Sequence, residues 1–119
     1  NANSLVKTER SKIEFEVPIV TVESFSKRNN IRVDCLKIDV EGAEYDQLLG
    51  AKFTMKDHRP VARLGLHPQS MAARGHSLEM IWELIGDYRY SISFEGAVMS
   101  KEDFCSNDNL FDVNLFPLE

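Results

Sequence analysis

The sequence predicts an α/β fold built around a mainly parallel β-sheet. Residues 33–40 alternate apolar and ionisable side chains, as a strand with two different faces does, and residues 45–49 then place apolar side chains at helical spacing. A second strand-like segment at 61–67 is followed by a second amphipathic segment at 78–85. Strands that alternate with helices in this way are typical of parallel sheets, so we expect one α/β domain.

The first third of the chain predicts an extended segment and a short helix. Residues 13–22 are rich in β-branched side chains, and Pro18 interrupts them because proline cannot donate a hydrogen bond to a neighbouring strand. Residues 23–29 are predicted as a short helix that ends at an Asn-Asn turn. The strand at 33–40 follows, and Gly42 turns the chain into the next helix.

The remainder predicts a strand, a helix and a closing pair of strands. The strand at 61–67 is expected to stop at a proline, and Ser77 is suited to cap the next helix. Residues 88–94 alternate as a strand, and residues 110–118 supply the last strand. The polar segment 101–109 between them is predicted to be a loop, and the last two strands are expected to pair antiparallel.

Composition limits the class of protein. The chain has 119 residues, of which 43% are hydrophobic, enough for one modest core, and its net charge of −5 argues against a nucleic-acid surface. Long apolar runs and an apolar N-terminal signal segment are absent, so we expect no membrane partner and a cytoplasmic location. Cys35 and Cys105 are interpreted as free thiols, with a disulfide as the alternative. The first residue is not methionine, which favours a piece of a longer protein.

Candidate functional residues lie where two predicted strands end. Ligands bind at the carboxyl ends of the strands in open α/β sheets, and those ends carry Asp39, Glu41 and His67. If the two strands are parallel neighbours aligned by their ends, Lys37 and Arg63 join these residues on one face of the sheet. The sequence therefore predicts two carboxylates, two cations and an imidazole in one patch, with His67 able to titrate near neutral pH.

Two other interpretations remain open for this patch. The charges can be structural, with Lys37 paired to Asp39 and Arg63 paired to Glu41. A metal ion bound by Asp39, Glu41 and His67 is a further alternative, but the nearby cations oppose it, so we assign no metal. Lys37 and Arg63 are predicted to support the site through ion pairs rather than to act in it.

Two longer runs of sequence carry a resemblance. Residues 17–25 read VPIVTVESF, residues 34–45 read DCLKIDVEGAEY, and a later strand ends in His67-Pro68. These elements resemble the FkbM family of S-adenosylmethionine-dependent methyltransferases, and the similarity extends over residues 17–90. The resemblance implies a Rossmann-like methyltransferase fold, with residues 1–119 forming a single partial domain that corresponds to its C-terminal half and whose last strand inserts antiparallel.

The resemblance also implies S-adenosylmethionine as the cofactor, with Asp39 both cofactor-binding and catalytic. The glycine-rich loop and the ribose-binding acidic residue of the family do not occur in these 119 residues. The cofactor site is therefore expected to be incomplete in this chain, and the isolated chain is expected to be inactive. The chain also departs from the family at Gly65, where members commonly have Glu.

The function implied by the resemblance is methyl transfer to an oxygen of a small molecule or sugar. Asp39 or His67 is expected to act as the base, with Glu41 orienting the acceptor. A different class of protein, a small α/β binding or assembly module without catalysis, remains the alternative. In that case the exposed edge of the sheet favours self-association.

Overall fold

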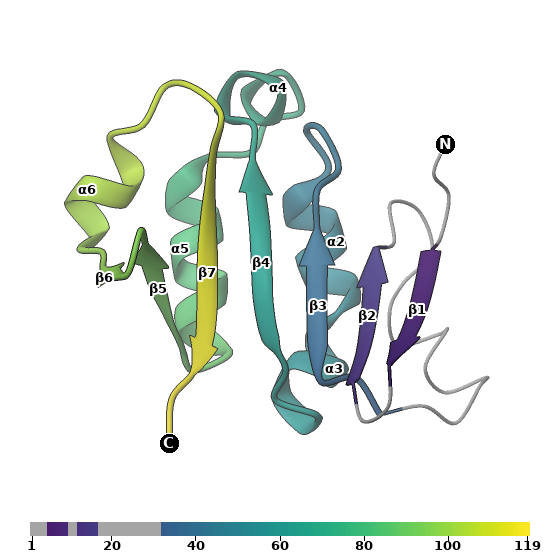
Figure 1. The fold of residues 1–119 in the computed structure, drawn as a ribbon. Helices are drawn as coiled ribbons and strands as arrows, with labels where there is room; N and C mark the ends of the chain where they lie inside the picture. The colour runs from purple at the N-terminus through teal and green to yellow at the C-terminus, as the bar shows by residue number, and fades with distance from the viewer. Residues whose placement is uncertain (1–4, 10–11, 17–31) are drawn as a thin grey trace.

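The computed structural model describes residues 5–9, 12–16 and 32–119, and in the first two segments it describes the backbone alone. Within these residues, seven strands form one sheet in the order β1-β2-β3-β4-β7-β5-β6 (Figure 1). The strands are β1 (Leu5–Glu9), β2 (Lys12–Glu16), β3 (Cys35–Ile38), β4 (Val61–Leu66), β5 (Tyr90–Phe94), β6 (Ala97–Val98) and β7 (Phe111–Pro117). The helices are α2 (Glu44–Gly50), α3 (Lys52–Asp57), α4 (Pro68–Ala73), α5 (Leu78–Asp87) and α6 (Lys101–Cys105).

The prediction of a mainly parallel sheet is wrong, because most neighbouring strands among those described run antiparallel. Among the strands described, β3 is parallel to β2 and to β4, whereas the other four neighbouring pairs are antiparallel. The reason is that β7 inserts between β4 and β5 and runs against both of them, while β1–β2 and β5–β6 are antiparallel pairs. The α/β class and the antiparallel last strand are confirmed.

Three short helices, α3, α4 and α6, were missed by the sequence prediction. Helix α4 begins at Pro68, because proline fits the first turn of a helix, where its missing N–H is not needed. Helix α6 replaces the loop predicted over 101–109, and the Ser100 hydroxyl caps it by accepting a hydrogen bond from the Asp103 N–H. The predicted elements that fall within residues 17–31, including the helix at 23–29, lie outside the described residues.

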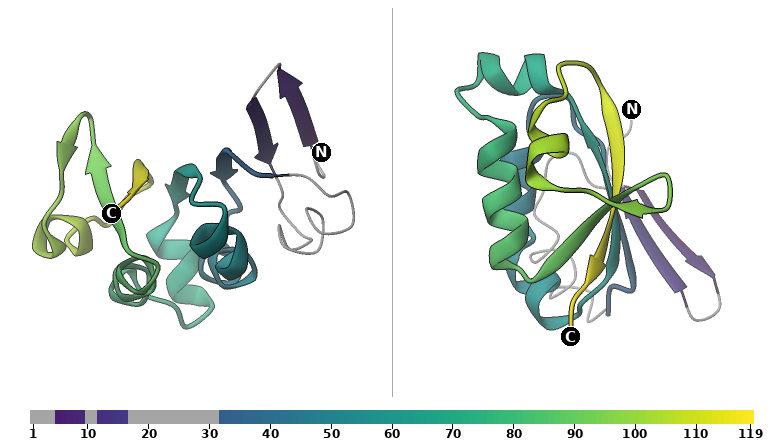
Figure 2. Two further views of the ribbon diagram at one scale, coloured as in Figure 1. Left: turned by 90° about the horizontal axis from the view of Figure 1, so that it is seen from below. Right: turned by 90° about the vertical axis from the view of Figure 1, so that its left-hand side faces the viewer.

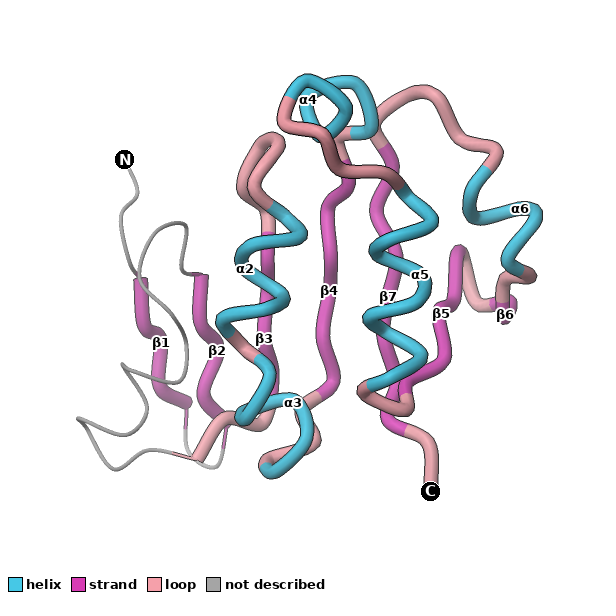
Figure 3. Tube along the Cα trace, turned by 180° about the vertical axis from the view of Figure 1, so that it is seen from behind, coloured by secondary structure: helices cyan, strands magenta, loops and turns pink. Residues whose placement is uncertain are grey.

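The helices cover one face of the sheet. Helices α2, α3 and α5 lie behind β3, β4 and β7 in Figure 1 and in front of them in Figure 3, while α4 sits beyond the carboxyl end of β4. Figure 2 shows the same layering from two other directions, and in the part of the chain that the structure describes no helix lies over the opposite face. Helix α5 begins at the predicted cap, Ser77, and buries Leu78, Ile81 and Ile85 against the sheet.

The core forms between these helices and the sheet. Strand β3 buries Leu36 and Ile38, and strand β4 buries Leu64 and Leu66 against the helical layer. Both cysteines are free. Among the helices described, none has both the length and the apolar character that a membrane span requires. The packed layer leaves the carboxyl ends of β3 and β4 side by side at the end of the sheet where α4 lies (Figure 1).

Candidate functional site

The register of β3 and β4 places the predicted site residues together. The two strands are parallel, and Lys37 pairs with Arg63 while Ile38 pairs with Leu64. This confirms the alignment by strand ends on which the predicted patch depends. The next position on β3 carries Asp39, beside Gly65 on β4.

A tight turn leads from β3 into α2. The Ala43 N–H donates to the Val40 carbonyl at 2.9 Å, and Gly42 between them has a φ of +86°, which favours glycine. A Cβ on Gly42 would lie 3.2 Å from the Ser70 Cβ and 3.2 Å from its carbonyl oxygen, so the turn packs closely against α4. The turn thereby fixes Glu44 as the first residue of α2, next to the carboxyl end of β4.

His67 lies between two carboxylates. Its Nδ1 is 2.5 Å from Oε2 of Glu44, and the same oxygen accepts a hydrogen bond from the His67 main-chain N–H at 3.0 Å. Its Nε2 is 3.8 Å from Oδ1 of Asp39. The Glu44 side chain is 0% exposed and the His67 side chain 19%, whereas that of Asp39 is 49% exposed. The imidazole is therefore held from behind by a buried acid and has a solvent-accessible acid on its other side.

Gly65 leaves room for a second carboxylate beside Asp39. A Cβ on Gly65 would lie 3.0 Å from Oδ1 of Asp39 and 3.0 Å from Oδ1 of Asp112 on β7. Strand register explains this, since Gly65 pairs with Asp112 across the antiparallel ladder. A larger residue at position 65 would push one or both acids away from the end of β4.

Arg63 supports the face from the other side. Its guanidinium donates to Oδ2 of Asp112 at 3.3 Å and to Oδ1 of Asn114 at 3.1 Å. The ion pair considered between Arg63 and Glu41 is therefore replaced by one with Asp112, because β7 rather than the β3–α2 turn lies next to Arg63. Lys37 occupies the register position beside Arg63 on β3.

Glu41 points to α4 and not to His67. Its Oε2 accepts a hydrogen bond from the Ser70 hydroxyl at 3.2 Å, and the residue is exposed. Of the three predicted site residues, Asp39 and His67 therefore lie together. Glu41 lies apart from them and contacts Ser70 instead. Ser70 also lines a neighbouring pocket.

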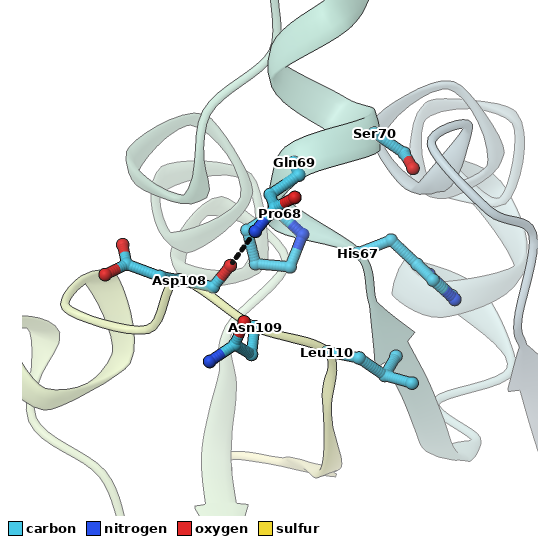
Figure 4. A pocket seen from close by; sticks show the side chains of 7 residues that line it. All are labelled: His67, Pro68, Gln69, Ser70, Asp108, Asn109 and Leu110. Atoms are coloured by element: carbon cyan, nitrogen blue, oxygen red, sulfur yellow. Dashed lines mark hydrogen bonds between the residues drawn. The ribbon is translucent and has the colours of Figure 1, made fainter.

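A pocket of about 210 Å³ adjoins this group of residues. Figure 4 shows His67 and Leu110 on one side of it and Asp108 and Asn109 on the other, with the Gln69 amide donating to the Asp108 carbonyl at 3.4 Å. The lining is His67, Pro68, Gln69, Ser70, Asp108, Asn109 and Leu110. The pocket thus offers hydroxyl, amide and main-chain carbonyl groups beside two apolar side chains, Pro68 and Leu110.

No group of three or more His, Cys, Asp or Glu residues in the described part of the chain is arranged to hold a metal ion. For a positively charged cofactor or an acceptor hydroxyl, Asp39 is the available acid. It is half exposed at the strand end, and its carboxylate lies 3.8 Å from the His67 ring. The arrangement can bind a hydroxyl, take its proton and stabilise the resulting positive charge.

Sequence reasoning missed Glu44 and Asp112. Glu44 stands inside the run at 34–45, but the reasoning followed strand alternation, which stops before the helix begins. Asp112 follows from register, and that register is set only when β7 is known to lie beside β4. The signal for Glu44 was present: an acid in the first helical turn directly after a strand end that already carries two acids.

Comparison with known proteins gives one match. A family described as Methyltransferase FkbM domain matches residues 1–92, which is more than half of the chain. Comparison with curated proteins and comparison with solved structures give no match. The matched range contains Asp39, Glu44 and His67, but it ends before β7, which supplies Asp112.

Proposed function

Because this chain belongs to the FkbM methyltransferase family, we propose that it takes part in S-adenosylmethionine-dependent methylation of an oxygen on a small molecule or sugar. The observation that carries the proposal is the placement of His67 between Glu44 and Asp39, beside a pocket and at the carboxyl end of parallel strands. Function concentrates at that end of α/β sheets. A strand order in which β7 inserts antiparallel between β4 and β5 supports a Rossmann-like methyltransferase fold.

Asp39 fits the cofactor in charge and position. A half-exposed carboxylate beside one histidine is suited to bind a sulfonium cation or a ribose hydroxyl. S-adenosylmethionine, when bound, supplies an electrophilic methyl group. The 119 residues contain no glycine-rich loop to cradle the rest of the cofactor, so Asp39 supplies one side of that site.

His67 is the base in this proposal. An acceptor hydroxyl within about 3 Å of Nε2 would pass its proton to the ring as the oxygen is methylated. The imidazolium formed then lies between the Glu44 and Asp39 carboxylates, which stabilise its charge. Glu41 acts indirectly, since its hydrogen bond fixes the Ser70 hydroxyl at the pocket lining.

The pocket supports a hydroxylated acceptor. Ser70, Asn109 and Asp108 provide donors and acceptors at different points of the wall, while Leu110 offers an apolar patch. Ligand sites typically combine a few placed polar groups of this kind with apolar surface. A small polyol or a sugar presents both kinds of surface to such a wall.

The test is transfer of a labelled methyl group from S-adenosylmethionine to a panel of sugars and small alcohols. In the longer protein that we expect to contain this chain, the wild type should label at least one acceptor. Asp39→Ala and His67→Gln in that protein should reduce turnover by about 10²-fold or more, since general base catalysis is worth that much. Both variants should keep the wild-type circular dichroism spectrum. Full turnover by both variants would remove these residues from the reaction.

Titration calorimetry separates this proposal from a non-catalytic α/β module. The 119-residue chain alone should give no binding heat with S-adenosylmethionine, because it lacks the glycine-rich loop. Tight binding by the chain alone would contradict the assignment of Asp39 as one side of a larger site. A wild-type protein that labels no acceptor would favour the binding or assembly module.

A further inference from the structure

We propose that Glu44 is a positioning residue that holds the neutral His67 ring as its Nδ1–H tautomer, which leaves Nε2 free to accept a proton. The inference rests on the function proposed above, in which His67 is the base. In a neutral imidazole one nitrogen carries the hydrogen and the other carries the lone pair, and the hydrogen bonds made by the ring decide which is which.

Glu44 contacts His67 twice through one oxygen. Oε2 accepts from the His67 main-chain N–H at 3.0 Å and is 2.5 Å from Nδ1 of the ring. An oxygen that accepts the main-chain N–H presents lone pairs on this side, so Nδ1 is the donor in the second contact. The Glu44 side chain is fully buried, and its other oxygen, Oε1, has no hydrogen-bond partner. The hydrogen bonds of this buried acid therefore depend on His67.

The opposite ring nitrogen is not held in the same way. Nε2 lies 3.8 Å from Oδ1 of Asp39, beyond the range of a hydrogen bond. Asp39 is half exposed, so its carboxylate can turn, whereas Glu44 is fixed in the first turn of α2. Of the two acids, Glu44 is the one placed to set the tautomer.

The tautomer decides whether His67 can act. With the hydrogen on Nδ1, the lone pair on Nε2 accepts the acceptor's proton, and the electrons of the broken O–H bond stay on the oxygen that is methylated. With the hydrogen on Nε2, the lone pair faces the buried acid and the ring has no free site for that proton. Wrong-tautomer histidines lose most of their activity in other enzymes that pair histidine with an acid.

Nitrogen NMR of the histidine-labelled protein tests this directly. Ring ¹⁵N shifts, followed over a pH series that includes the neutral ring, show which nitrogen carries the hydrogen. We expect Nδ1–H for His67 in the wild-type protein. In Glu44→Met, which keeps the length of the side chain but removes the acceptor oxygen, we expect a shift of the population toward Nε2–H. The same variant should lower kcat by at least about 10-fold with KM little changed, because Glu44 does not line the pocket.

Asp46→Asn is the matched control. Asp46 lies in the same helix but is exposed and pairs with Arg74 at 3.7 Å, so both the tautomer and kcat should match the wild type. An Nε2–H tautomer in the wild-type protein, or an unchanged Nδ1–H population in Glu44→Met, would overturn the inference. If the wild-type protein methylates no acceptor, the proposed function fails, whereas the NMR result still decides whether Glu44 sets the tautomer.

Discussion

The two ends of strand β4 handle polar groups in opposite ways. The strand begins after Arg59 and Pro60, in a corner where side chains saturate main-chain carbonyls with hydrogen bonds. It ends at His67, where three acids gather around one imidazole and one glycine and where a buried oxygen of Glu44 has no partner. The first arrangement holds the fold together, and the second leaves charge available to a ligand.

Arg59 is the centre of the first arrangement. Its guanidinium donates four hydrogen bonds to main-chain carbonyls, and it also stacks over the Tyr90 ring at 4.8 Å. The Tyr90 hydroxyl in turn donates to the Pro60 carbonyl at 2.6 Å. The carbonyls that Arg59 contacts belong to Met55, Tyr88, Arg89 and Leu118.

From this contrast we expect that the Arg59 end of β4 contributes mainly to stability and that the His67 end contributes to the proposed reaction. Polar groups whose hydrogen bonds are made within the protein stabilise the fold, but they have few free donors or acceptors for a substrate. Groups at the other end stay exposed or under-partnered, which costs stability and permits binding. Substitutions at the two ends should therefore separate the free energy of unfolding from turnover.

Arg59→Ala should cause the largest loss of stability. It removes four hydrogen bonds and a cation–π contact, and we expect the free energy of unfolding to fall by about 2–4 kcal/mol in denaturant titrations. Arg89→Ala is the control, since Arg89 also has a positive φ, 63° against 53°, but donates only to the Glu119 carbonyl in the contacts described. Equal losses of unfolding free energy in the two variants would show that the four hydrogen bonds of Arg59 add no particular stability.

Tyr90 should give the corner a response to alkaline pH. Burial raises the pKa of the Tyr90 phenol from 10.0 to about 12, and Arg59 opposes this in part. The folded state therefore keeps a proton that the unfolded state releases above pH 10.0, so stability should fall as pH rises from 10.0 toward 12.

The measurement is the difference between the wild type and Tyr90→Phe in denaturant unfolding across that pH range. Near neutral pH the variant should be less stable by about 1 kcal/mol, because it loses the hydrogen bond to Pro60. Its disadvantage should shrink as pH rises, since phenylalanine has no proton to lose. Parallel curves for the two proteins would contradict the burial of the phenol.

Gly65→Ala should show the smallest change in stability but a clear change at the site. The new Cβ would meet the Asp39 and Asp112 carboxylates at 3.0 Å, and both are flexible side-chain ends that can move away. We expect the free energy of unfolding to stay within about 1 kcal/mol of the wild type, while turnover falls by about 10-fold because Asp39 leaves His67.

Gly86→Ala is the matched control for that substitution. Gly86 lies within α5, and a Cβ there would meet nothing within 4 Å. The variant should gain up to about 1 kcal/mol, as alanine does in a helix, with turnover unchanged. If Gly65→Ala retained full turnover, the crowding at the end of β4 would have no bearing on catalysis.

Local pattern was sufficient to predict much of this fold. Alternation located β3 and β4, helical spacing located α2 and α5, and Ser77 marked where α5 begins. The short helices α3, α4 and α6 were missed because helices of five or six residues are too short to show periodicity. A proline marks the start of α4 and a serine that of α6, and α3 has no side-chain cap. The sheet was wrongly predicted to be mainly parallel because β1 and β6, which each add an antiparallel pair, were not predicted as strands; the antiparallel last strand was expected.

The site was also predicted only in part. Strand ends and register were enough to bring Asp39 and His67 together. They placed Glu41 beside His67, whereas the turn at Gly42 directs it to Ser70. The sequence marked Glu44 only as an acid in the first helical turn after the end of β3. Its burial and its two contacts with His67 depend on the fold, so they could not be predicted from the sequence.

The choice of acceptors by Arg59 has a consequence for how the chain can vary. All four of its bonds go to backbone oxygens, which every amino acid possesses. The four hydrogen bonds therefore depend on where the main chain runs and not on which side chains those residues carry. Substitutions at position 118 should therefore leave this contact intact, whereas position 59 itself has no substitute with the same reach and planar fork.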